Sequence, residues 1–82
     1  MTLTIDYPAT LPDALHMTAS EFERTARFAM ASRLYQEGRI SSGQAAQFAG
    51  LNRVDFLLEL PRHGMSMSNL SDEDFLGDVH HA

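Results

Sequence analysis

The chain has 82 residues, a net charge of −5, six arginines, no lysine and no cysteine. This length allows one domain with a modest core, which oligomerisation often supports. A protein without cysteine forms no disulfides, which is typical of the reducing cytosol. The first residues lack a signal peptide's basic and apolar regions, and no stretch approaches the roughly 20 apolar residues of a membrane span. We expect a cytoplasmic protein without membrane association.

Residues 2–6 alternate between polar and apolar side chains. This alternation predicts a β-strand with Leu3 and Ile5 on one face. Because a single strand is not stable alone in water, we expect it to pair across a homodimer. Pro8 and Pro12 then bracket an expected extended linker.

A long helix is predicted to begin after Thr18, because Glu21 three residues later completes a capping box. The helix is expected to run to about Glu37, with Gly38 as its C-cap. It carries a wide apolar stripe, typical of a helix that packs on more than one neighbour. The stripe consists of Phe22, Ala26, Ala29, Met30 and Leu34, extended by Phe28, Ala31 and Tyr35. We expect this helix and the strand to supply the dimer interface, with Leu3, Ile5 and Phe28 as contact residues.

Residues 41–60 have the pattern of a helix-turn-helix. Ser41 and Gln44 form a second capping box, and Gly50 suits the left-handed backbone of a tight turn. Asn52 caps the second helix, which carries Val54, Phe56, Leu57 and Leu60. DNA docking in the major groove and an ordinary helical hairpin are both compatible with this pattern.

Candidate DNA contacts lie at the starts of these two helices. The first helix offers phosphate contacts from Ser41, Ser42 and Gln44, and the second offers base or phosphate contacts from Asn52 and Arg53. Asp55 and Glu59 on the second helix oppose phosphate binding. The alternative roles of these residues are helix caps and solvated surface side chains.

Residues 65–82 are predicted to form a partner-binding tail after a body of residues 1–64. The tail holds four of the eleven acids, next to apolar side chains. Such a segment suits folding onto a basic partner, such as the rim of a nuclease active site, whereas a loosely packed solvated tail is the alternative. The expected partner contacts are Met65, Met67, Leu70, Phe75, Leu76 and Val79.

The sequence predicts neither a metal site nor enzymatic activity. The histidines at positions 16, 63, 80 and 81 lack the spacing of metal ligands. A nucleophilic cysteine, a lysine and a glycine-rich phosphate loop are all absent, so we also expect no cofactor.

Three stretches, residues 3–15, 21–51 and 53–60, carry a resemblance that covers nearly the whole chain. They resemble a small antitoxin-like family of uncharacterised bacterial, archaeal and cyanobacterial proteins encoded beside PIN-domain-like toxins. The resemblance implies a type II antitoxin that neutralises a PIN-like ribonuclease toxin, with operator DNA as a further candidate partner. The alternative is a helical protein-interaction adaptor that does not bind DNA. The expected fold class is mainly α, with an N-terminal β-strand, a long helix, a helix-turn-helix and an extended acidic C-terminal tail.

Overall fold

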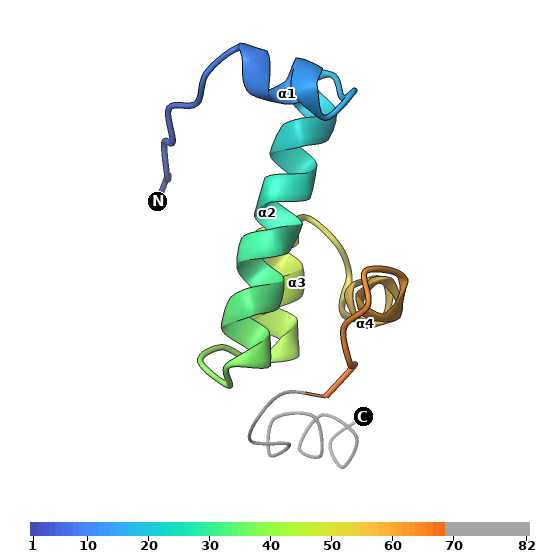
Figure 1. Ribbon diagram of the computed structural model, residues 1–82. Coiled ribbons are helices and arrows are strands. Elements are labelled where there is room, and N and C mark those ends of the chain that lie inside the picture. Colours follow the sequence, from blue (N-terminus) through green and yellow to red (C-terminus); the bar gives the residue numbers. More distant parts are fainter. Residues whose placement is uncertain (69–82) are drawn as a thin grey trace.

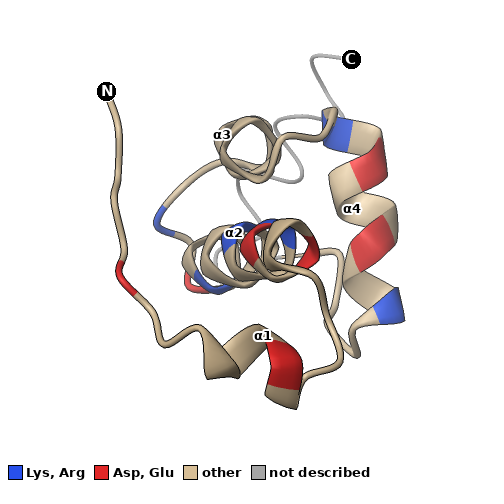
Figure 2. Cartoon of the chain, turned by 90° about the horizontal axis from the view of Figure 1, so that it is seen from above, with Lys and Arg blue, Asp and Glu red and all other residues tan. Residues whose placement is uncertain are grey.

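A computed structural model describes residues 1–68 of the chain. Four helices follow one another along the chain: α1 (Thr10–Ala14), α2 (Ala19–Gln36), α3 (Ser42–Ala49) and α4 (Arg53–Arg62). The long helix α2 is central, with α1 at its N-terminal end and α3 along its C-terminal half (Figure 1). Residues 1–8 and α4 lie on opposite sides of α2 (Figure 2). The predicted mainly helical fold class is confirmed.

The predicted helix starts are confirmed by their capping hydrogen bonds. At the start of α2, the Thr18 hydroxyl accepts from the Glu21 N–H at 3.1 Å, and the Glu21 carboxylate accepts from the Thr18 N–H at 2.9 Å. The hydrogen bond from the Thr18 N–H to the carboxylate is the largest cause that lowers the pKa of Glu21 below its ordinary value. Ser41 and Gln44 form the same reciprocal pair at the start of α3, with both distances at 3.0 Å. Local sequence alone specifies these starts, because each pair satisfies N–H groups that have no partner inside the helix.

The core is formed where α3 and α4 pack against the C-terminal half of α2. Phe56 of α4 is fully buried between two aromatic rings of α2, with ring centroids 5.5 Å from Phe28 and 5.7 Å from Tyr35. Small side chains on α3 leave room for this aromatic cluster. The buried apolar residues are Phe28, Ala31, Tyr35, Ala45, Ala46, Phe56, Leu57 and Leu60.

The core buries only part of the predicted apolar stripe of α2. Every buried residue of α2 lies in its second half: Phe28, Ala31, Ser32 and Tyr35. Phe22, Ala26 and Met30 are half-buried, whereas Ala29 and Leu34 are exposed. The buried face is shifted because α3 and α4 cover only one side and one end of the helix. The N-terminal half of α2 therefore extends beyond the core, where Phe22 and Ala26 are only half-buried.

The predicted N-terminal strand is absent from the part of the chain that the structure describes. Residues 1–8 have no regular structure, and within residues 1–68 no backbone–backbone hydrogen bond involves residues 1–7. The physical reason is that a strand needs a partner strand, and these 68 residues supply none. The expected acidic tail falls on residues 69–82, outside the described residues.

The extended linker predicted between Pro8 and Pro12 is wrong, because the chain forms α1 there. Pro12 occupies the first turn of this short helix, where a missing N–H removes no intrahelical hydrogen bond. The helix ends at Ala14, with Leu15 as its C-cap; His16 then has a left-handed φ of 57°, and Met17 N–H donates to the Pro12 carbonyl at 2.9 Å. This closure directs the chain into α2.

Candidate functional site

The helix-turn-helix unit is α3, a three-residue turn and α4. Gly50 has a φ of 78°, the left-handed conformation that the sequence predicted for the turn. Leu51 N–H donates to the Ala46 carbonyl at 2.9 Å, which closes the end of α3. Asn52 then caps α4, with its side-chain oxygen accepting from the Asp55 N–H at 2.8 Å. These hydrogen bonds fix how the chain leaves α3 and enters α4.

The five predicted DNA contacts form two groups at opposite ends of α3. An eight-residue helix separates them by about 12 Å. Ser41 and Gln44 are engaged in the capping box, and Ser42 is fully buried. Asn52 caps α4 and also donates to the Asp55 carboxylate at 2.9 Å, while Arg53 is half-buried. Capping therefore accounts for most of these side chains, as the alternative reading of the sequence expected.

One stripe of the exposed surface of α4 and the preceding turn is apolar. Val54 is 57% exposed, Leu58 is 56% exposed, and Leu51 in the preceding turn is 36% exposed. We call these three residues the outer face of α4. Val54 and Leu58 are one helical turn apart, so their side chains are neighbours. Sequence reasoning named Val54 among the apolar residues of this helix without assigning it a face, and it did not name Leu58, although their spacing of four sets both apart from Phe56 and Leu60.

Charges along α4 are arranged with arginines at both ends and acids between them (Figure 2). Arg62 donates to the Glu59 carboxylate at 3.1 Å, and the His63 ring nitrogen lies 3.5 Å from the other Glu59 oxygen. Asp55 is exposed on the same helix. The Arg62 charge is thus partly compensated by Glu59, and α4 does not present the uniformly positive surface that favours DNA phosphates.

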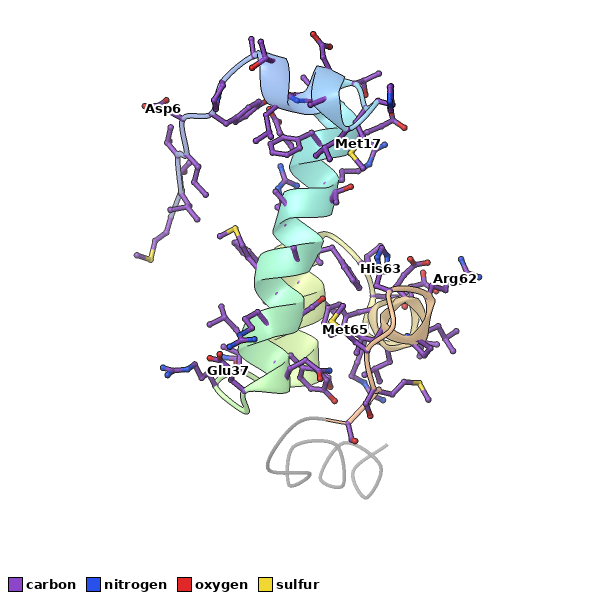
Figure 3. All side chains as sticks on the ribbon, in the orientation of Figure 1. Asp6, Met17, Glu37, Arg62, His63 and Met65 are labelled. Carbon is purple, nitrogen blue, oxygen red and sulfur yellow. The ribbon has the colours of Figure 1, made fainter. Side chains whose placement is uncertain are left out.

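The first predicted partner-binding residues are attached to the body. Met65 packs against the core and lies between α4 and the α2–α3 pair (Figure 3). Two side chains of α2 hold the next residues: Tyr35 donates to the Met67 carbonyl and Gln36 to the Ser66 carbonyl, both at 2.7 Å. The chain therefore leaves the described body from a fixed position beside the C-terminal end of α2. Leu70, Phe75, Leu76 and Val79 lie outside the described residues.

The predicted dimer contacts occupy two different environments. Leu3 is 60% exposed and Ile5 is 55% exposed. Phe28 instead belongs to the core, in contact with Phe56 and with the His63 ring, whose centroid is 4.8 Å away. The side chain of Phe28 is thus committed to the fold of its own chain.

Among residues 1–68, no three histidine, cysteine, aspartate or glutamate side chains group as a metal site would require. No helix in this range has the length and apolar character to span a membrane.

A small helical protein with a helix-turn-helix unit is the class that this architecture defines. The chain belongs to the uncharacterised protein family UPF0175, which it matches over residues 1–82. It is similar to a UPF0175 protein from Aeropyrum pernix, with 38% identity over 69 residues that cover 84% of this chain and 76% of the relative. No solved structure matches the chain.

Proposed function

We propose that the protein is an antitoxin that binds and neutralises a PIN-domain-like ribonuclease toxin. The observation that carries this proposal is the apolar outer face of α4. In a DNA-binding helix-turn-helix, the second helix presents polar and basic side chains to the major groove. Here the corresponding helix exposes Leu51, Val54 and Leu58 beside carboxylates. Contiguous exposed apolar side chains indicate a surface that another protein covers.

The charge of this surface indicates the chemistry of the partner. Asp55 is exposed and Glu59 half-exposed near the outer face of α4, with Arg53 and Arg62 at the ends of the helix, and the sequence of residues 69–82 holds four further acids. A complementary partner has apolar sites surrounded by lysine and arginine. A ribonuclease has such basic residues where it binds RNA phosphates. Covering that region blocks the substrate, which is how the proposed antitoxin neutralises its toxin.

The anchored exit of the chain supports a contact that extends from the body into the tail. Residues 66 and 67 are held on α2 by Gln36 and Tyr35, so the residues that follow start from a defined position. Anchoring one end of a binding segment reduces the entropy that is lost when the segment is ordered on a partner. The tail and the body then act together on one toxin.

A binding experiment with the product of the neighbouring gene, as the candidate toxin, tests the proposal. We expect the double variant Val54→Ser and Leu58→Ser to bind the toxin about 10-fold or more weakly, because exposed apolar anchors supply much of an interface's free energy. The matched control is Leu34→Ser on α2, an exposed leucine outside the outer face of α4, with 37% of its surface exposed. Absence of binding by the unchanged chain refutes the antitoxin proposal, and equal affinities of the two variants exclude the outer face of α4.

Binding to operator DNA is the second candidate function, favoured by the geometry of α3, the Gly50 turn and α4. The described residues hold six arginines and seven acids, so any affinity depends on few cations and falls steeply with salt. We expect Arg53→Ala to weaken binding to the protein's own promoter by about 1 kcal/mol or more, measured by titration at low salt. If the unchanged protein does not bind that promoter, DNA binding is excluded. The helix-turn-helix unit then acts as a protein-interaction adaptor without DNA affinity.

A further inference from the structure

A groove of about 710 Å³ lies between residues 1–5 and α2, on the side of α2 opposite α4 (Figure 2). Its walls combine the N-terminal segment, the extended N-terminal half of α2 and one aromatic side chain of α3. Its apolar lining includes Leu3, Ile5, Phe22, Ala26, Met30 and Phe48. The groove is therefore lined by the half-buried members of the predicted α2 stripe, Phe22, Ala26 and Met30.

The N-terminal segment is fixed at one end of this groove. The Tyr7 hydroxyl donates to the Glu23 carboxylate at 2.6 Å, and the Tyr7 ring lies 4.8 Å from the Phe22 ring. The hydrogen bond raises the pKa of Tyr7 above its ordinary value. Beyond this anchor, residues 1–6 extend along the groove with exposed side chains and no backbone hydrogen bond to the described chain.

An occupant of the groove must meet two requirements at once. It must supply backbone hydrogen bonds to an extended segment, and it must place apolar side chains against the exposed stripe of α2. A strand with alternating apolar residues meets both requirements. Residues 2–6 are themselves such a strand, and their two apolar side chains lack cover in a single copy.

We infer that two copies of the chain associate by antiparallel pairing of residues 2–6, and that this pair closes the groove of each copy. With Thr4 on the twofold axis, Leu3 lies opposite Ile5 of the second copy, so all four apolar side chains share one face. Asp6 lies opposite Thr2. Parallel in-register pairing would instead place Asp6 beside Asp6, and like charges directly opposite each other are destabilising. Charge and alternation therefore both select the antiparallel twofold arrangement, which gives a closed dimer.

This dimer goes beyond the proposed function and does not require a toxin. Residues 1–8 and α4 lie on opposite sides of α2, so pairing leaves the outer face of α4 exposed in both copies (Figure 1). The dimer then presents two separate toxin-binding surfaces.

A single introduced cysteine tests the pairing, because the chain has no cysteine of its own. Residues directly opposite in an antiparallel pair have Cα atoms about 4.5–5.5 Å apart, which is within the reach of a disulfide. We expect Thr4→Cys in the full chain to form a disulfide-linked dimer about 10-fold or more faster than the control Val54→Cys on the exposed outer face of α4, because pairing raises the local thiol concentration.

Light scattering on the unchanged chain and on Ile5→Lys completes the test. The unchanged chain is expected at twice the 9.1 kDa mass of one copy. Ile5→Lys is expected at the single mass with unchanged helical circular dichroism, because Ile5 lies outside the core. A monomeric unchanged chain, a dimeric Ile5→Lys variant, or equal crosslinking rates of the two cysteine variants would each overturn the inference. None of these measurements involves a toxin, so their failure is distinguishable from failure of the proposed function.

Discussion

Replacing Phe56 with alanine is expected to lower the free energy of unfolding by about 3–5 kcal/mol. Phe56 is fully buried and contacts the rings of both Phe28 and Tyr35, so its removal leaves a cavity where α2 and α4 meet. Domains of this kind have a total stability of only about 5–15 kcal/mol. The loss corresponds to a fall in Tm of roughly 10 °C or more, measured by thermal and urea unfolding monitored by circular dichroism.

The control for this variant is Val54→Ala, two residues earlier on the same helix. Val54 is exposed, so its truncation is expected to change stability by no more than about 0.5 kcal/mol. Similar losses from the two substitutions would mean that α4 does not pack through Phe56 as the structure describes.

Deleting residues 71–82 is expected to abolish neutralisation of the toxin while leaving Tm within a few degrees of the full chain. The core lies entirely within residues 28–60, with Met65 packed against it, so the deletion removes none of these contacts. It removes all four acids of the tail together with Phe75, Leu76 and Val79. The readouts are toxin ribonuclease activity at equal concentrations of the two proteins and thermal unfolding of the truncated chain.

A charge variant separates the acids of the tail from its apolar side chains. Replacing Asp72, Glu73 and Asp74 with the corresponding amides retains Phe75 and Leu76. We expect slower association with the toxin at low salt and a much smaller difference at high salt, because these charges act mainly on the rate of encounter. For the deletion of residues 71–82 described above, a truncated chain that still neutralises the toxin would place the whole inhibitory contact in the body.

Sequence predicted the structure best where neighbouring residues determine it. The capping boxes at Thr18 and Ser41 and the left-handed turn at Gly50 each depend on side chains within three residues or on one backbone conformation. The five-residue helix α1 was missed because it is too short to show a helical period. Pro8 before this helix and Pro12 within it also suggested an extended chain.

Burial could not be predicted from the same patterns, because it depends on which elements meet in three dimensions. The α2 stripe has apolar residues on more than one face, and only the packing of α3 and α4 decides that Phe28 and Tyr35 are buried while Leu34 is exposed. Ser42 was predicted to contact DNA from its position in a helix start, yet it lies fully inside the fold. Val54 and Leu58 are exposed on the same helix whose Phe56 and Leu60 are buried, and the apolar character of these residues did not distinguish the two faces.

All buried residues of α2 lie in its second half. The molecule therefore has two regions that differ in local stability. The C-terminal half of α2, with α3 and α4, forms a cooperative unit that opens only when the whole fold does. Residues 1–8 lie outside that unit, and their ordering depends on what covers the groove beside them. Association of two copies and ordering of this non-helical segment are therefore one coupled equilibrium, so protein concentration sets how much of it is structured.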